Sequence, residues 1–145
     1  MPGNNPHDEL FKATFSITSE VAVFLKYYLP HLGRHLHLKS LKQEQTSYIS
    51  ENLKEFFSDI VYTCKWKSAD DSMSSGIKIA FLLEHKSYLP DNIYIQLLRY
   101  LTETYHYQYQ NKQALQLTIP VVVYHGADKW QMRTFEDYFE LPDQY

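Results

Sequence analysis

Hydrophobic residues recur at helical spacing in the N-terminal part of the chain. Two apolar stripes occupy 8–16 and 18–29, and Pro30 ends the second. The stripes contain Leu10, Phe11 and Phe15, and then Val21, Phe24, Leu25, Tyr28 and Leu29. The pattern predicts two helices, or one helix broken near Ile17.

Three later runs have the composition of strands. Residues 57–66 and 77–83 are rich in apolar, β-branched and aromatic side chains, and the polar segment 68–76 between them predicts a hairpin. Residues 117–124 form a third apolar run, in which Pro120 is tolerable at a sheet edge or at the start of a strand. Residues 48–56 are expected to form a turn or a short helix before the first strand.

A helix is expected between the second and third strands. It begins after Pro90, and its predicted core face consists of Ile93, Leu97, Leu98, Leu101 and Tyr105. A polar face is expected from Gln96, Arg99, Tyr100 and Glu103, which follow helical spacing. A last helical turn is predicted at 134–139.

The segment 31–42 has a poor hydrophobic pattern and is interpreted as an irregular connection. It carries His31, His35 and His37, and the spacing of His31 and His35 would suit a metal on a helix. No carboxylate or cysteine completes a ligand set within the segment, so surface histidines are the preferred interpretation.

Taken in order, these elements predict an α/β fold with a mixed sheet between helices, in the order α-β-β-α-β. A chain of 145 residues with 44% hydrophobic and 21% charged residues is long enough for one domain, spanning 1–145. No apolar run approaches the roughly 20 residues of a membrane span, and the polar N-terminus lacks a signal-peptide core. Cys64 has no second cysteine to pair with, which fits a cytoplasmic location.

The strongest chemical signal is a group of ionisable residues at the end of the second predicted strand. Alternation along a strand places Glu84 and Lys86 on one face and His85 on the other. The hairpin brings Asp59, near the start of the first strand, close to Glu84. Two carboxylates with a backbone carbonyl, here that of His85, are typical ligands of Mg²⁺ or Mn²⁺. Lys86 on the same face could then orient a water molecule or stabilise charge.

Structural explanations stand beside each of these assignments. Asp59 alone suits a turn or an ion pair, and Glu84 with Lys86 suits a salt bridge at the end of a strand. Arg99 could contact a phosphate or pair with Glu103, while His85 is expected to be a structural histidine. Because the net charge is −3, a broad basic surface for nucleic acid is not expected, although a local patch is compatible with it.

In this order the residues resemble the PD-(D/E)xK nuclease superfamily, in which a lone Asp is followed by Glu-x-Lys. More narrowly, the chain is similar to the Rpn family of recombination-promoting nucleases, also described as YhgA-like transposases. The resemblance rests on HDELFK at 7–12, FSDIVY at 57–62, LLEHKS at 82–87, QLLRY at 96–100 and IPVVVYHG at 119–126.

This resemblance implies a restriction-endonuclease-like core and a metal-dependent DNA endonuclease linked to recombination or phage defence. Its implied site comprises Asp59, Glu84, Lys86 and Gln96. Members of the superfamily sometimes supply a further acidic ligand from the first helix, so Asp8 or Glu20 is a less favoured candidate for that ligand. Members of the family usually run longer, so the chain is expected to be the N-terminal part of such a protein. Homodimerisation is left open, and the alternative function is a DNA- or protein-binding module with little or no cleavage.

Overall fold

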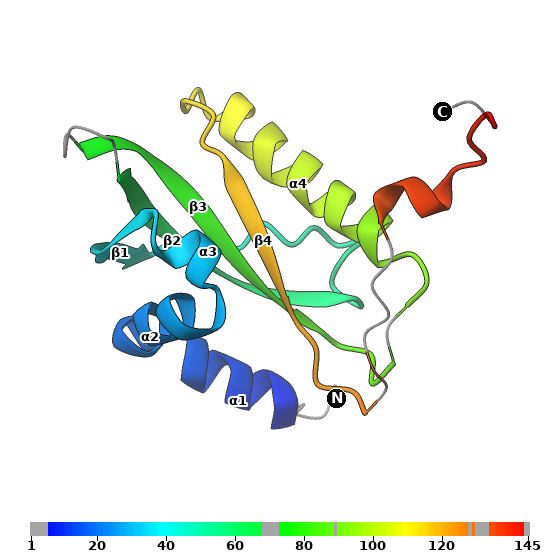
Figure 1. Ribbon diagram of the computed structural model, residues 1–145, viewed down its shortest axis with the longest axis horizontal. Coiled ribbons are helices and arrows are strands. Elements are labelled where there is room, and N and C mark those ends of the chain that lie inside the picture. Colours follow the sequence, from blue (N-terminus) through cyan, green and yellow to red (C-terminus); the bar gives the residue numbers. More distant parts are fainter. Residues whose placement is uncertain (1–5, 68–72, 89, 128, 130–133, 144–145) are drawn as a thin grey trace.

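The computed structural model describes residues 6–67, 73–88, 90–127, 129 and 134–143, and a four-stranded mixed sheet forms its centre (Figure 1). The strands lie side by side in the order β1-β2-β3-β4. The elements are α1 Pro6–Phe15, α2 Thr18–Tyr28, α3 Pro30–Gly33, β1 Leu36–Gln43, β2 Phe57–Lys67, β3 Met73–Glu84, α4 Ile93–Gln110, β4 Thr118–Val123 and the 3₁₀ helix η1 Phe135–Tyr138. The α/β class and the sheet between helices are therefore confirmed.

Residues at alternating positions of the two central strands, β2 and β3, pack into two separate hydrophobic cores, one on each face of the sheet. On one face, Ile60, Tyr62 and Phe81 pack with residues of α1 and α2. On the other face, Val61 and Leu82 pack with α4 and with the segment that precedes β2. The sheet is thus covered on both sides, which is why the strands read as continuous apolar runs.

The two N-terminal helices form as predicted, with the break at Ser16 and Ile17. Phe11 and Phe15 of the first stripe are buried, but Leu10 is 66% exposed; Tyr28 of the second is 74% exposed. Both helices are short and contact the sheet along a narrow strip, so positions at the margin of the stripe face solvent. Residues 51–56 form a turn and η1 lies within 134–139, as expected. Of the polar loop predicted at 68–76, residues 68–72 lie outside the described residues, whereas 73–76 belong to β3, so this strand begins earlier than predicted.

The prediction of an irregular connection at 31–42 is wrong. Its first residues form α3, and β1 follows as an antiparallel partner of β2 on the sheet edge. The register of β1 shifts between His37 and Lys42, so the apolar alternation of a strand is interrupted within it. This irregularity explains why the hydrophobic pattern gave no strand signal.

The predicted hairpin is present, and the helix expected between the second and third strands forms as α4. β2 pairs with β3 in antiparallel register from Phe57 opposite Glu84 to Cys64 opposite Ile77. β4 then pairs with β3 in parallel, with Val121 opposite Phe81, after the connection through α4. Because β4 is an edge strand, Pro120 removes no hydrogen bond from a central ladder.

The predicted core face of α4 is only partly right: Ile93 is buried and Leu97 packs against the core, but most of the buried row is a different one. Its buried residues are Ile93, Gln96, Tyr100, Thr104 and Gln108, whereas Leu98 is 51% exposed. Four of these five recur at intervals of four residues and carry polar groups, so a polar row of the helix faces the sheet. The sheet face that α4 covers also carries polar residues, including Asp59, Lys78 and Glu84. Polar residues of the helix therefore pack against polar residues of the sheet, which explains why this row is buried instead of the leucines.

No helix within the described residues combines the length and the apolarity that a membrane span requires.

Candidate active site

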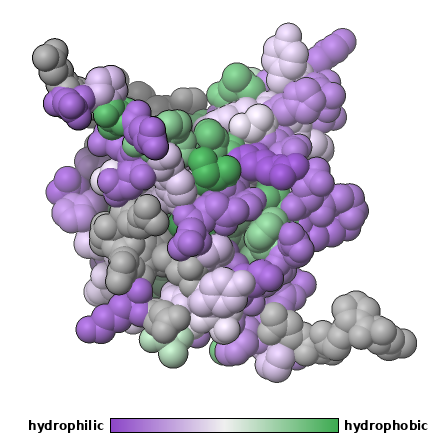
Figure 2. Space-filling model, turned by 90° about the vertical axis from the view of Figure 1, so that its right-hand side faces the viewer, coloured by the Kyte–Doolittle hydropathy of each residue, from purple (hydrophilic) through white to green (hydrophobic). Residues whose placement is uncertain are grey.

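Asp59 and Glu84 lie on the α4 side of the sheet. Glu84 is directly opposite Phe57, and Asp59 is opposite Leu82, so the two carboxylates occupy diagonal positions on neighbouring strands. Diagonal residues of an antiparallel pair are typically about 7–8 Å apart, within reach of a bridging ligand. The molecular face at the end where β3 terminates is mainly hydrophilic, with small hydrophobic patches (Figure 2).

Asp59 is fixed by three hydrogen-bond donors. Ser47 Oγ donates to Oδ1 at 2.5 Å, while the backbone N–H of Tyr48 and the hydroxyl of Tyr100 donate to Oδ2 at 2.9 and 2.8 Å. An ionised carboxylate offers about four acceptor positions, so roughly one remains open. The geometry therefore orients Asp59 rigidly and leaves it room for one further partner.

The Glu84 side chain is fully buried, and only one of its two carboxylate oxygens has a hydrogen-bond donor among the described residues. Its Oε1 accepts a hydrogen bond from the backbone N–H of Lys86 at 3.0 Å, whereas Oε2 has no hydrogen-bond partner among the described residues. Burial raises the pKa of Glu84, and the backbone N–H and positive charge of Lys86, with a smaller contribution from His125, oppose that rise. A buried carboxylate with an unpaired oxygen is costly unless a cation compensates it.

Lys86 and His85 lie just beyond the end of β3. The charge of Lys86 acts on Glu84, so the two side chains are close together. The imidazole of His85 instead lies 2.8 Å from Ser58 Oγ, and Ser58 alternates with Asp59 along β2. The expected opposite orientation of His85 is therefore confirmed.

Gln96 and Tyr100 project from the row of α4 that faces the sheet. Tyr100 is fully buried, and its hydroxyl reaches Asp59. Burial raises the pKa of Tyr100, and so does the neighbouring Asp59 carboxylate, so the hydroxyl remains a hydrogen-bond donor. Gln96 is 8% exposed and lies one turn closer to the helix N-terminus. Its position is compatible with the predicted site.

The residues present fit a hard divalent cation. No group of three His, Cys, Asp or Glu side chains converges within the described ranges. The candidate ligands are therefore the carboxylates of Asp59 and Glu84 and the backbone carbonyl of His85. Such a set, with the remaining positions left to water and phosphate, is typical of Mg²⁺. The unpaired Oε2 of Glu84 and the open position on Asp59 are the observations that support this fit.

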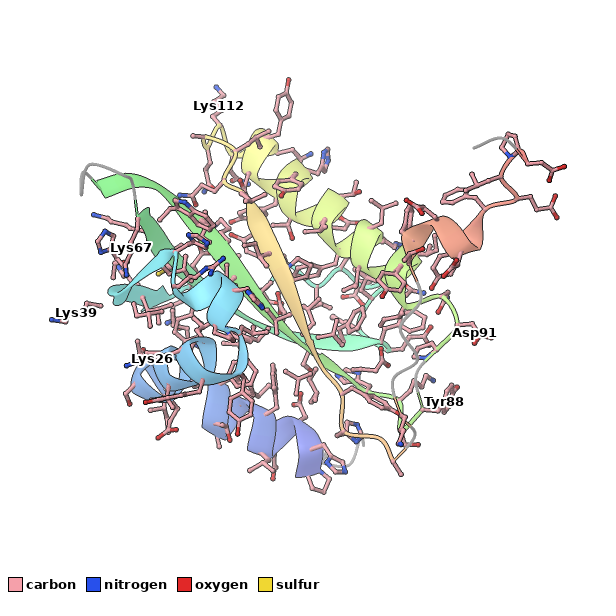
Figure 3. The ribbon with its side chains drawn as sticks, viewed as in Figure 1. Lys26, Lys39, Lys67, Tyr88, Asp91 and Lys112 are labelled. Atoms are coloured by element: carbon pink, nitrogen blue, oxygen red, sulfur yellow. The ribbon has the colours of Figure 1, made fainter. Side chains whose placement is uncertain are left out.

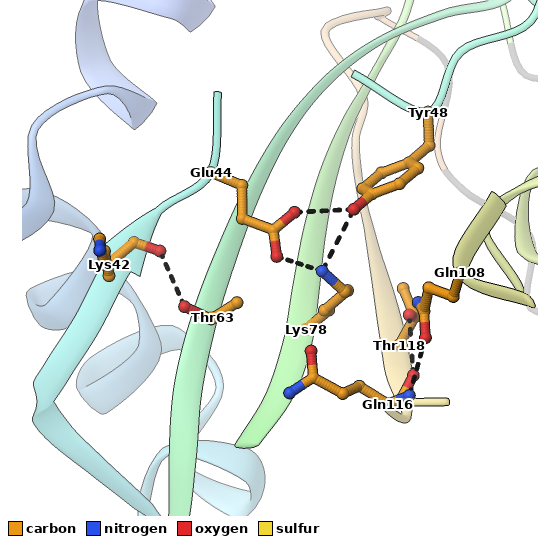
Figure 4. A network of polar contacts seen from close by, with 8 residues as sticks. All are labelled: Lys42, Glu44, Tyr48, Thr63, Lys78, Gln108, Gln116 and Thr118. Atoms are coloured by element: carbon orange, nitrogen blue, oxygen red, sulfur yellow. Dashed lines mark hydrogen bonds and ion pairs between the residues drawn. The ribbon is translucent and has the colours of Figure 1, made fainter. Parts of the chain in front are cut away.

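A second polar network adjoins the same sheet face (Figure 4). Lys78, only 4% exposed, forms an ion pair with Glu44 and donates to the hydroxyl of Tyr48 at 3.2 Å. Tyr48 donates to Glu44 at 2.8 Å, and its backbone N–H is one of the donors to Asp59. Tyr48 therefore connects the buried ion pair to the candidate site.

Sequence reasoning missed Ser47 and Tyr48 as partners of Asp59, because they come from an irregular segment with no pattern of its own. Tyr100 had a signal, since it lies four residues after Gln96 and so shares its helix face.

The minor candidates have other surroundings. Asp8 pairs with Lys12 at 2.7 Å; burial raises its pKa, but hydrogen bonds from Lys12 and Ser58 outweigh burial and leave it lowered. His35 stacks on Trp66, and within the described chain Arg99 forms no ion pair with Glu103.

Comparison with known proteins places these motifs in a family. The sequence profile described as "Putative transposase, YhgA-like" matches residues 5–144. The inactive recombination-promoting nuclease-like protein RpnE of Escherichia coli K12 is 32% identical over 85% of this chain and 40% of its own length. The recombination-promoting nucleases RpnD of Escherichia coli O157:H7 and RpnA of Escherichia coli K12 are 31% and 28% identical, each over 86% of this chain and over 46% and 41% of their own lengths.

The chain thus spans less than half the length of each of these three relatives. No solved structure matches the chain significantly.

Proposed function

Because the chain belongs to the YhgA-like transposase family, several of whose relatives are named recombination-promoting nucleases, we propose that it is a metal-dependent DNA endonuclease domain of the PD-(D/E)xK type. The observation that supports this most is the fully buried Glu84 carboxylate, with one unpaired oxygen, diagonal to Asp59. Buried polar atoms are normally hydrogen-bonded, so a buried carboxylate oxygen with no donor among the described residues suits a bound cation.

Each site residue has a defined task in this proposal. Asp59 and Glu84, with the backbone carbonyl of His85, would hold Mg²⁺ or Mn²⁺, which when bound supplies an activated water and neutralises phosphate charge. Ser47, Tyr48 and Tyr100 keep Asp59 in the orientation that binding needs.

Lys86 and Gln96 would act on the reacting groups rather than on the cation. Lys86 lies next to Glu84 and carries an ammonium group that can orient the attacking water and stabilise developing negative charge on the phosphate. Gln96, on the buried row of α4, can donate or accept a hydrogen bond at the same place.

A second candidate function is a DNA- or protein-binding module on the same fold, with little or no cleavage. It is favoured by the relative RpnE, whose name describes it as inactive. The three donors on Asp59 also give that residue a structural explanation without a metal.

The lysine variant Lys86→Ala separates the two functions. Cleavage of supercoiled plasmid in Mg²⁺ should fall by about 10²–10³-fold, the usual cost of one electrostatic stabiliser. DNA affinity, measured by gel shift in Ca²⁺, should stay within a few-fold of wild type. Lys86→Gln should retain more activity than Lys86→Ala, because an amide can still donate a hydrogen bond.

Wild type in EDTA and Lys54→Ala in Mg²⁺ serve as controls, since Lys54 is an exposed lysine paired with Glu51 outside the site. Equal cleavage by wild type and Lys86→Ala would contradict the nuclease role of this strand. DNA binding by wild type without cleavage would favour the binding module.

A further inference from the structure

A pocket of about 510 Å³ lies among α2, α3, β1 and the end of β2. Among the described residues, the charged side chains that line it are all basic: Lys26, Arg34, Lys39 and Lys67. This is notable in a chain with 17 acidic and 14 basic side chains and a net charge of −3. Figure 3 shows Lys26, Lys39 and Lys67 on one side of the molecule, away from Tyr88 and Asp91.

The four basic side chains are exposed, and within the described part of the chain none of them forms an ion pair with a carboxylate. His37 also lines the pocket, and its buried Nε2 has no hydrogen-bond partner there. The pocket therefore concentrates several positive charges that no described carboxylate neutralises. These groups suit a ligand with several anionic oxygens.

A lysine on an edge strand also discourages strand pairing with other molecules, and that accounts for Lys39 on β1. It does not account for Lys26, Arg34 and Lys67, which come from α2, from the end of α3 and from the end of the central strand β2. Their convergence on one pocket calls for a common partner.

The pocket is separate from the candidate active site. Lys67 is eight residues beyond Asp59 along β2, a distance of about 26 Å at the rise of an extended strand. The pocket is also lined by α2 and α3, whereas the candidate site lies under α4. A DNA segment at Asp59 and Glu84 would thus leave this pocket to another stretch of DNA.

We propose that this basic pocket binds the phosphate backbone of a DNA segment distinct from the one at Asp59 and Glu84. The inference rests on the proposed function for its choice of DNA. Backbone binding of this kind is independent of base sequence and releases counterions, so it weakens as salt concentration rises.

The test compares two double variants with the same change in charge. Lys39→Gln/Lys67→Gln removes two pocket lysines, and Lys54→Gln/Lys112→Gln removes two exposed lysines elsewhere. The affinity of each for a fluorescent 30-base-pair duplex is measured by anisotropy in Ca²⁺ over a series of salt concentrations.

For the pocket variant, the slope of log affinity against log salt should become shallower by about 2, since each phosphate contact contributes about 0.9. The ratio of the DNA affinity of wild type to that of the pocket variant should therefore fall roughly tenfold between about 50 and 200 mM salt. The control variant should keep the wild-type slope.

Equal slopes for wild type and the pocket variant would overturn the inference and leave the nuclease proposal standing. An equal loss of slope in the pocket variant and the control variant would also overturn it, because DNA binding would then depend on the net charge of the protein and not on the position of the lysines. If wild type binds no DNA, both proposals fail. Displacement of the duplex by ATP at an equal phosphate concentration and constant ionic strength would show that the pocket takes free nucleotides and would overturn the assignment to DNA.

Discussion

Replacing Glu84 by Gln should stabilise the metal-free protein. The substitution keeps the size of the side chain and the acceptor for the backbone N–H of Lys86, but removes a buried negative charge. An unsatisfied buried polar group costs about 1–3 kcal/mol. An amide also leaves a polar group without a partner at this position, so the gain comes from removing the buried charge, which costs more to bury than a neutral group; it should be about 1 kcal/mol at neutral pH.

The pH dependence follows from the raised pKa of Glu84. Because burial lifts the folded pKa above the 4.5 of an unperturbed carboxyl, the folded state binds the proton more tightly than the unfolded chain. Stability therefore falls as pH rises through the range between the two values, and the full cost is present above the folded pKa. Glu84→Gln should lose this part of the pH dependence.

Divalent metal should reverse the order of stability. At a Mg²⁺ concentration one hundred times its dissociation constant, wild type should gain about 2.7 kcal/mol, whereas Glu84→Gln should gain almost nothing. Urea denaturation of wild type and Glu84→Gln at pH 5 and pH 8, each in EDTA and in Mg²⁺, measures these free energies of unfolding. A Glu84→Gln variant that is less stable than wild type in EDTA would refute the reasoning, because Glu84 would then have a structural partner.

Two further substitutions test the surroundings of the site. Tyr100→Phe keeps the buried ring but removes the donor to Asp59, so it should lower the free energy of unfolding by about 1.5–3 kcal/mol, as for a hydrogen bond to a charged group. Tyr109→Phe, on the exposed side of the same helix, should change it little in the same urea titration, and equal shifts would remove the special role of Tyr100. Lys78→Met should cost about 3–5 kcal/mol, because it leaves the Glu44 carboxylate without its cation. The double variant Glu44→Leu/Lys78→Met should cost less than the sum of the two single variants, and additive effects would show that the pair is not coupled.

The parts of the fold that could be predicted from sequence are those with a strong local pattern. β2 and β3 are apolar runs separated by a polar loop, and their alternation was enough to predict that Asp59 and Glu84 share one face of the sheet and that His85 points to the other. β1 was missed because a register shift breaks its alternation, and short edge strands carry little hydrophobic signal.

The buried face of α4 was predicted only in part, for a physical reason that bears on function. Leucines normally mark the buried side of a helix, but here Gln96, Tyr100, Thr104 and Gln108 face the sheet. The helix turns its polar row inward because the sheet below it carries buried charges. Ser47 and Tyr48 could not be found at all, since their contact with Asp59 depends on a long-range approach of an irregular segment.

Calorimetric titration of Mn²⁺ tests the central claim most directly, namely that Asp59 and Glu84 hold one divalent cation. Wild type should bind one Mn²⁺ per chain with measurable heat, and Asp59→Ala and Glu84→Gln should each abolish that heat. Glu9→Gln is the control, since Glu9 is an exposed carboxylate of α1 that has no part in the proposed site. Wild-type heat from either Asp59→Ala or Glu84→Gln would contradict the account.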